Sequence, residues 1–298
     1  MTPSGAPLYR RIAFIGFGLI ASSMARAIRA LGLADSIAGC ARSAATRDRV
    51  RELGLADSIH DDPAAAAAGA DLVVVATPLS AYSAVGRALG GALAEDATLT
   101  DVGSVKQSAI RDLGPYVPDH AHFIPGHPIA GTEHSGPDAG FAELFHGRWC
   151  ILTPIPGTDR DSVRRLESLW TALGSRVTEM EPAHHDKVLA ITSHLPHIIA
   201  YTIVGTATDL SEDLKQEVIS YSASGFRDFT RIAASDPEMW RDVFLNNREA
   251  VLEMLQRFNE DLTTLQRAIR WGEADVLYDY FSRTRDIRRR IIEAKQAD

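Results

Sequence analysis

The chain has 298 residues, 45% of them apolar and 23% charged, which is ordinary for a globular protein and long enough for two domains. Its net charge of −8 argues against non-specific nucleic-acid binding, which needs a basic surface, so we expect no nucleic-acid partner. The two cysteines, Cys40 and Cys150, are far apart and form no paired motif. This spacing argues against a disulfide framework or a zinc site and fits a reducing compartment.

Targeting segments are not evident in the sequence. Residues 1–11 lack the apolar core of a signal peptide, and no uninterrupted apolar run approaches the roughly 20 residues that span a bilayer. We therefore expect a soluble, cytoplasmic protein with no membrane partner.

From Arg10 to Met180 the chain alternates short apolar runs with helical stretches. The strand candidates are Ile12–Ile15, Ser36–Cys40, Leu72–Ala76, Thr98–Val102, His122–Pro125, Trp149–Thr153 and Arg176–Met180. Helical patterns cover Ser22–Leu31, Ala44–Leu53, Ala81–Leu93 and Arg160–Leu173, and Asp62 with Pro63 predicts a short helix start. Strand and helix in alternation predict an α/β fold, a Rossmann-type doubly wound parallel sheet with helices on both faces.

After Pro182 the strand patterns stop. Val188–Ala207, Met239–Ile269 and Ala274–Ala294 have helical periodicity, with Gly272 separating the last two. We therefore predict a dinucleotide-binding domain at 1–181 and an all-helical domain at 182–298. The helices have more apolar surface than about 115 residues can hide, which favours a homodimer through this domain. The arginines between 283 and 290 fit a solvated helix end better than an anion site.

A glycine-rich turn directly follows the first predicted strand. Gly16 permits a tight turn, Gly18 lets the backbone approach a pyrophosphate, and Ala21 allows close packing of helix on strand. The phosphates would lie at the N-terminus of the next helix. Because the motif follows a strand and opens a helix, it predicts dinucleotide binding over a merely structural turn.

The choice between NAD and NADP depends on the end of the second strand. An acidic residue that would hold the ribose 2′-hydroxyl of NAD is missing there, since Ala41 is followed by Arg42 and Ser43. Arg42 and Ser43 could contact a 2′-phosphate, or Arg42 could stack on adenine or point to solvent. NADP use is possible, and NAD use is not excluded.

Two other strand ends have polar residues suited to chemistry. One is Asp101–Lys106, where Ser104 occupies an apparent helix N-cap position, so its alternative role is the cap alone. The other contains His127, between Gly126 and Pro128 on a predicted loop. A histidine at such a strand end suits a general base near neutral pH.

In the helical domain, two polar segments could line a cleft. Pro196 would kink its helix close to His194 and His197, and we interpret His194 as a buried, satisfied side chain. The second segment is Ser224–Arg231, in which Arg231 could grip a carboxylate, or pair with Asp228 or Asp236.

Five motifs in this order together resemble the prephenate/arogenate (cyclohexadienyl) dehydrogenase family of tyrosine biosynthesis. They are GFGLI at 16–20, DVGSVK at 101–106, GHPIAGTEHSGPDAGF at 126–141, SHLPH at 193–197 and FRDFTRIAASDPEMW at 226–240. Ala21 in place of the third glycine and the non-acidic Ala41 depart from the family pattern. On this resemblance we expect no chorismate mutase domain before Arg10 and no regulatory domain after the helical one.

The resemblance implies an oxidative decarboxylation. A base takes the proton of the ring 4-hydroxyl, hydride leaves C4 for NAD or NADP, carbon dioxide is lost and the ring becomes aromatic, without a metal. The catalytic residues it implies are His127 and Ser104. The substrate-binding ones are Arg231, His197, Trp240 and, from the neighbouring subunit, Asp228. The cofactor-binding ones are Gly16, Phe17, Gly18, Leu19, Ile20, Arg42, Ser43 and Thr77.

Two other functions compete with this one. A β-hydroxyacid or imine-reducing dehydrogenase also joins a Rossmann domain to a helical one, but the sequence around Lys187 lacks the glycines of the lysine motif in relatives of 3-hydroxyisobutyrate dehydrogenase. A dinucleotide-sensing regulator would need neither His127 nor Arg231. The residues do not distinguish prephenate from arogenate.

Overall fold

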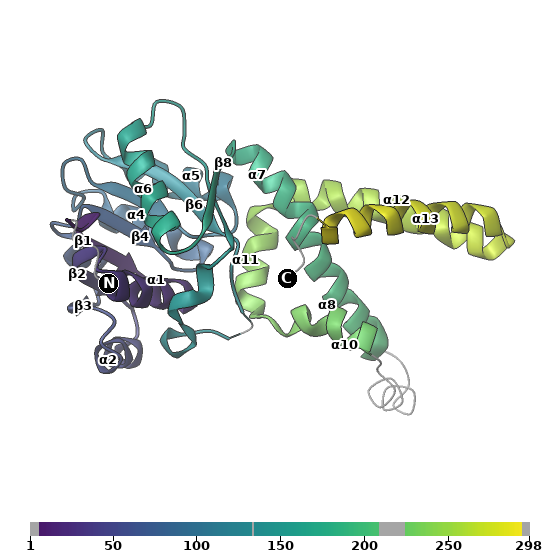
Figure 1. Cartoon of the computed structure of the whole chain (residues 1–298), viewed down its shortest axis with the longest axis horizontal. Helices are drawn as coiled ribbons and strands as arrows, with labels where there is room; N and C mark the ends of the chain where they lie inside the picture. Colours follow the sequence, from purple (N-terminus) through teal and green to yellow (C-terminus); the bar gives the residue numbers. More distant parts are fainter. Residues whose placement is uncertain (1–5, 133, 209–223, 294–298) are drawn as a thin grey trace. The chain divides into compact units, whose positions relative to one another are not determined.

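The computed structural model describes residues 6–132, 134–208 and 224–293. They form two compact units, 1–248 and 249–298 (Figure 1). The predicted domain boundary at 181/182 falls within the first unit, so that division remains a prediction.

An eight-stranded sheet is the centre of the first unit, in the order β3-β2-β1-β4-β5-β6-β7-β8. The strands are β1 Tyr9–Ile15, β2 Ala34–Cys40, β3 Ser58–His60, β4 Leu72–Val75, β5 Thr98–Asp101, β6 His122–Pro128, β7 Trp149–Leu152 and β8 Arg176–Glu179. All seven predicted strands are present, within a few residues of the predicted bounds. The order reverses between β1 and β4, and such a reversal marks the ligand-binding crevice of doubly wound sheets.

Two features of the sheet differ from the prediction. The strand β3 is not predicted from the sequence, since it has three residues and one apolar side chain, Ile59. The sheet is also not parallel throughout, because β7 runs antiparallel to β6, with Gly126, His127 and Pro128 opposite Leu152, Ile151 and Cys150. The first half of β6 pairs in parallel with β5. β6 therefore continues past the end of the parallel sheet and carries His127 there.

Helices cover both faces of the sheet. They are α1 Leu19–Leu31, α2 Ala44–Glu52, α3 Pro63–Ala67, α4 Tyr82–Leu89, α5 Lys106–Leu113 and α6 Arg160–Ala172. The predicted start of α3 is confirmed, since the Asp62 carboxylate accepts hydrogen bonds from the amides of Ala64 and Ala65, and Pro63 is the first helical residue.

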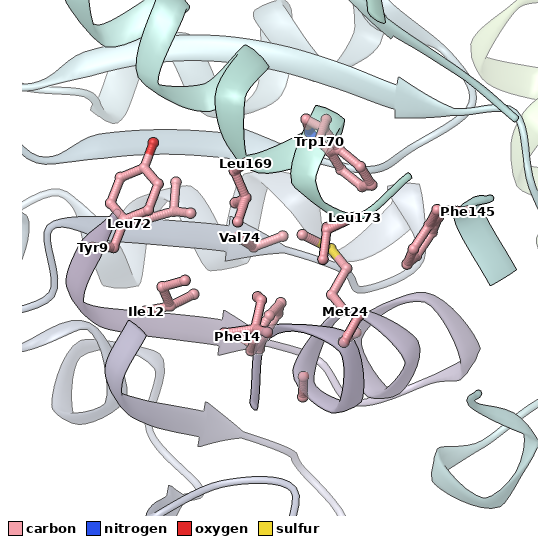
Figure 2. Close-up of a cluster of buried hydrophobic side chains, with 14 of the residues drawn as sticks. Tyr9, Ile12, Phe14, Met24, Leu72, Val74, Phe145, Leu169, Trp170 and Leu173 are labelled. Atoms are coloured by element: carbon pink, nitrogen blue, oxygen red, sulfur yellow. The ribbon is translucent and has the colours of Figure 1, made fainter. Parts of the chain in front are cut away.

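The core consists of two clusters, one on each face. Alternate residues of a strand point to opposite faces, so Ile12 and Phe14 of β1 belong to one cluster and Ala13 and Ile15 to the other. Figure 2 shows the first cluster, in which side chains from β1 and β4 meet helices α1 and α6 around Trp170. Because both faces are buried, the central strands are continuous apolar runs.

The first unit continues into helices after β8. They are α7 Pro182–Leu189, a π-helical turn Ala190–His194, α8 Leu195–Thr208, α10 Ser224–Thr230, the short 3₁₀ helix η6 Arg231–Ala234 and α11 Pro237–Asn246. The π-helical turn lies just before Pro196, which lacks the amide hydrogen that a regular turn would use. The expected irregularity at this proline is therefore present.

One helical run, 182–207, is long and apolar enough to cross a membrane by length and composition alone, with a mean hydropathy of 1.4. The sequence analysis did not single it out because Asp186, Lys187 and several histidines interrupt it. Asp186 accepts hydrogen bonds from backbone amides of α5, so the start of this helical run is attached to the first helical turn of α5.

The second unit contains two long helices, α12 Arg248–Trp271 and α13 Ala274–Glu293 (Figure 1, yellow). Gly272 ends α12 with a φ of +68°, a left-handed conformation that favours glycine. Both helices have exposed apolar side chains: Leu252, Leu262, Ile269, Trp271, Val276, Tyr278, Phe281 and Ile287. Two helices alone cannot bury this surface.

Candidate active site

A cavity of about 370 Å³ lies at the carboxyl ends of β1, β4, β5 and β6. Six of the residues proposed from the sequence line it: Gly18, Leu19, Ile20, Thr77, Ser104 and His127. Part of its wall comes from Ser235 and Asp236, which lie between η6 and α11, and from Met239, Asp242 and Val243 of α11. Segments far apart in the sequence thus meet around one cavity, as expected for a doubly wound fold.

The turn from β1 to α1 has the features of a pyrophosphate cradle. Gly16 has a φ of +97°, and a Cβ there would lie 2.7 Å from the carbonyl oxygen of Ala76, so a larger residue does not fit. A Cβ on Gly18 would meet no atom within 4 Å, which leaves open space beside the backbone. No side chain caps α1, so its first amides remain available for phosphate oxygens.

Thr77 and Phe17 differ in what they can offer a cofactor. The Thr77 hydroxyl is buried at the cavity and has no hydrogen-bond partner among the described residues. The Phe17 side chain instead packs edge-on against Phe14 in the core, so only its backbone can face a ligand. The cradle, the uncapped helix and the Thr77 hydroxyl fit a dinucleotide.

The end of β2 presents Arg42 and Ser43, both exposed. The Arg47 guanidinium donates to the carbonyl oxygens of Ala41 and Arg42, and Ser43 caps α2 by accepting from the amide of Thr46. Cys40 is the last residue of β2, and its pKa is raised to about 11 by burial and by the carboxylates Asp62 and Asp61, which follow the neighbouring strand β3. Charges of both signs therefore flank the predicted adenosine-ribose site.

His127 is buried and its ring is fixed from behind. Its Nδ1 lies 2.9 Å from Nε2 of His185, and Nδ1 of His185 lies 2.8 Å from Oδ1 of Asp186. With Nδ1 engaged, Nε2 is the ring nitrogen left for the cavity that His127 lines. Burial, followed by the nearby His185, Lys106 and His194, holds the pKa of His127 well below its usual range, so the ring is neutral near pH 7.

Ser104 lines the cavity but does not cap α5, which rules out its alternative role as a helix cap. The Asp186 carboxylate caps that helix, accepting from the amide of Lys106 at 2.7 Å and from that of Gln107 at 2.9 Å. Because the cap comes from α7, the Ser104 hydroxyl remains free for other partners in the cavity.

Lys106 and Asp101 form a fully buried ion pair of 2.5 Å beneath the cavity. The Lys106 ammonium also donates to the carbonyl oxygen of Gly126 at 2.6 Å, next to His127. Asp101 further accepts from the Tyr82 hydroxyl and from the amides of Gly103 and Gly126. Burial lowers the pKa of Lys106, while Asp101 opposes that effect. The pair fixes the loop of Ser104 and the strand of His127 to each other.

Another set of predicted residues gathers beside the helices. His197 stacks on Trp240, with ring centroids 3.6 Å apart. Burial lowers the pKa of His197, the hydrogen bond to the Ser193 carbonyl opposes this effect, and the Arg231 guanidinium adds to it, so Arg231 lies near this stack. Arg231 and Asp228 are exposed, and Asp236, one proposed partner of Arg231, caps α11. His197, Trp240, Arg231 and Asp228 do not line the cavity that holds His127.

His194 is buried as predicted but is not fully satisfied. Its Nδ1 contacts the Asn247 amide at 3.1 Å, whereas its Nε2 is buried without a partner among the described residues. Burial is the main reason why its pKa falls to about 4.

The segment after His127 forms a further wall of the cavity, which the sequence does not predict. Thr132 and residues 134–136 line the cavity, and the chain then crosses α1, where the Phe141 amide donates to Ser23. A Cβ on Gly140 would lie 2.6 Å from Cβ of Ser22, so this crossing needs glycine. Glu133, within the same motif, lies outside the described residues.

A larger hollow of about 660 Å³ lies elsewhere, beside Pro154–Pro156 and Met180. Of its three charged residues, Arg111 and Glu179 are engaged in ion pairs with Asp112 and Arg160, and Glu181 caps α7. Because it contains none of the motif residues, we place the active site in the smaller cavity.

The doubly wound sheet, the glycine cradle and a buried histidine at the strand ends define a dinucleotide-binding oxidoreductase. The family model described as prephenate dehydrogenase, nucleotide-binding domain, matches residues 24–179, and the one described as prephenate dehydrogenase, dimerization domain, matches residues 181–283. The chain belongs to the prephenate dehydrogenase family.

Individual relatives agree with this assignment. The chain is 41% identical to a cyclohexadienyl dehydrogenase of Zymomonas mobilis, over 94% of this chain and 96% of the relative. A crystal structure of prephenate dehydrogenase from Aquifex aeolicus, in complex with hydroxyphenyl propionate and NAD+, superposes with a TM-score of 0.88 at 32% identity, covering 95% of this chain and 98% of that one. A Synechocystis arogenate dehydrogenase gives 0.79 at 28% identity, covering 93% and 98%.

The buried Lys106–Asp101 pair yields a stability prediction. Lys106→Met should lower the free energy of unfolding by about 3–5 kcal/mol, because it leaves the Asp101 charge and the Gly126 carbonyl buried without the ammonium. Urea unfolding measures the change. The matched control is Arg51→Met, which breaks the exposed 2.5 Å pair with Asp48 and should cost less than about 1 kcal/mol. Equal losses in the two variants would contradict the proposed role of the buried pair.

Proposed function

We propose that this chain catalyses the oxidative decarboxylation of prephenate to 4-hydroxyphenylpyruvate, of arogenate to tyrosine, or of both, as a step of tyrosine biosynthesis. The observation that carries the proposal is the neutral His127, held by its Nδ1 at the edge of a cavity that also contains Gly18 and Ser104. The relatives named above support both substrates. A spectrophotometric assay of nicotinamide reduction with prephenate and with arogenate tests the proposal directly.

In this proposal His127 is the general base. Its Nε2 accepts the proton of the ring hydroxyl as the C4–H bond breaks, and Ser104 orients that hydroxyl from the opposite loop. Because burial keeps His127 neutral, the ring can accept a proton at physiological pH. Loss of carbon dioxide then leaves an aromatic ring, which makes the reaction favourable.

For the cofactor, Gly16, Phe17, Gly18, Leu19 and Ile20 would hold the pyrophosphate through the backbone, with Thr77 as a further donor. When bound, the nicotinamide supplies the hydride acceptor. Arg42 and Ser43 would lie at the adenosine ribose, opposite Asp61 and Asp62 of the neighbouring strand end. We propose NAD as the cofactor, with NADP also accepted.

For the substrate, Arg231 would bind a carboxylate in a bidentate manner, and the stacked His197 and Trp240 would lie along the ring. Asp228 would approach from a neighbouring subunit. Arg231 near His197 supports this arrangement, since an exposed guanidinium beside two aromatic rings suits an anionic, unsaturated ring.

We further propose a homodimer formed through the helical domain, with functional domains at 1–181 and 182–298 in a cytoplasmic protein. The exposed apolar side chains of α12 and α13, together with Leu245 on α11, support the dimer because such a surface needs a cover. The match to a dimerization domain points the same way.

The role of His127 predicts the effect of its removal. His127→Asn should lower turnover by about 10²- to 10⁴-fold, the usual cost of losing a general base, while NAD affinity stays near wild type. Stopped-flow assays measure the turnover, and calorimetric titration measures the NAD affinity. In the wild type, kcat/KM should hold above the lowered pKa of His127 and decline as pH falls through it, below about 6.5. Near-normal turnover in the variant would refute the assignment.

The role of Arg42 makes a cofactor prediction. Wild type should show measurable activity with NADP, and Ala41→Asp should shift the preference toward NAD by repelling the 2′-phosphate. Arg42→Ala should raise KM for NADP more than KM for NAD. Initial rates with both cofactors test this, with Arg51→Ala as an exposed control. A wild type that rejects NADP outright would show that Arg42 does not contact the phosphate.

The role of Arg231 separates substrate binding from structure. Arg231→Ala should raise KM for prephenate or arogenate strongly, with cofactor affinity and Tm nearly unchanged. Arg231→Lys should rescue in part, since lysine keeps the charge but loses the planar fork. Steady-state kinetics and thermal melts distinguish this from a structural ion pair, for which Tm and both affinities would fall together.

A further inference from the structure

His185 and Asp186 lie behind His127 and belong to none of the motifs that identified the site. Both are fully buried on α7, and the three side chains are joined in a row by contacts of 2.9 and 2.8 Å. His185 is next to His184, which is exposed on the same helix.

The chemistry of the row fixes the direction of its hydrogen bonds. Asp186 receives hydrogen bonds from the amides of Lys106 and Gln107 as well as contacting Nδ1 of His185, so its carboxylate acts as an acceptor toward all three. Nδ1 of His185 therefore carries a hydrogen. A neutral imidazole has one such hydrogen, so Nε2 of His185 presents a lone pair to His127.

This lone pair then sets the tautomer of His127. Its Nδ1 must donate to Nε2 of His185, which leaves Nε2 of His127 unprotonated and directed to the cavity. That is the tautomer a general base requires. With the opposite tautomer, Nε2 would carry a hydrogen and could not accept the hydroxyl proton.

We propose that His185 and Asp186 are positioning residues, which hold His127 as the Nδ1–H tautomer with Nε2 free to accept the substrate proton. The inference rests on the proposed role of His127 as base. Asp186 has a second part in it, because the carboxylate that orients His185 also caps α5, directly after the loop of Ser104. One carboxylate thus fixes both the base and the loop that faces it.

Two substitutions at His185 separate positioning from packing. His185→Leu keeps an apolar body but removes the acceptor, and should lower kcat by roughly 10- to 100-fold, as loss of an orienting partner does elsewhere, with KM for NAD unchanged. His185→Gln places an acceptor and a donor on one planar group and should recover most of the lost kcat. His184→Leu, the matched control on the exposed side of α7, should keep wild-type kcat. Thermal melts accompany all three.

Nitrogen NMR of ¹⁵N-histidine protein tests the tautomer without any assay. In the wild type, the His127 ring should be protonated at Nδ1 and unprotonated at Nε2. Its signals are assigned as those that vanish in His127→Asn. In His185→Leu this ring should become a mixture of tautomers, and in His185→Gln it should stay Nδ1–H.

The outcomes distinguish the two proposals. A wild type that is inactive with prephenate and arogenate but shows the Nδ1–H ring would overturn the proposed function and leave the positioning pair intact. A His127 ring protonated at Nε2 in wild type would overturn the positioning pair. So would wild-type kcat in His185→Leu, or equal losses of kcat and Tm in the Leu and Gln variants.

Discussion

The buried carboxylate of Asp186 is the interaction on which the site depends. It accepts from two backbone amides at the start of α5, and its Oδ1 contacts Nδ1 of His185, so it joins α7 to the helix that follows β5. The side-chain amide of Asn247 donates to the backbone oxygen of Asp186. Because helix ends leave amides without partners, a carboxylate at this place satisfies a structural need and can orient a neighbouring ring at the same time.

The antiparallel partner of β6 gives His127 its place. In a purely parallel sheet the strand would end near Pro125, where pairing with β5 stops, and the next residues would belong to a loop. Pairing with β7 extends regular backbone through Gly126, His127 and Pro128. Lys106 secures the same point by donating to the Gly126 carbonyl. The histidine therefore stands on rigid backbone, which positions a side chain better than a loop does.

Much of the fold follows from local patterns. The strands of the core were predictable because their apolar runs are continuous, and the cofactor turn because Gly16 and Gly18 stand between a strand and a helix. The three residues of β3 are too few to show a strand pattern, and the apolar run of β7 does not indicate whether the strand runs parallel or antiparallel to its neighbour.

The site was harder to predict than the fold. His185 meets His127 across 58 positions and Asp186 caps α5 across 80, so capping rules, which search within one helical turn, could offer only Ser104 as a candidate cap. Pairings at this range depend on how the elements pack.

The polar network around His127 is costly to bury, and its geometry shows how that cost is offset. Asp101, Lys106, His185 and Asp186 are all withdrawn from water, and a well-packed apolar core could be as stable. These groups make hydrogen bonds to one another, to His127, to the Tyr82 hydroxyl and to backbone groups of the strand and helix ends, so the network is satisfied as it stands. A network of this kind is worse than an apolar core when one member is missing, which makes its members interdependent. In return, the ring and the loop around the base hold one arrangement, so that little has to move when the proton does.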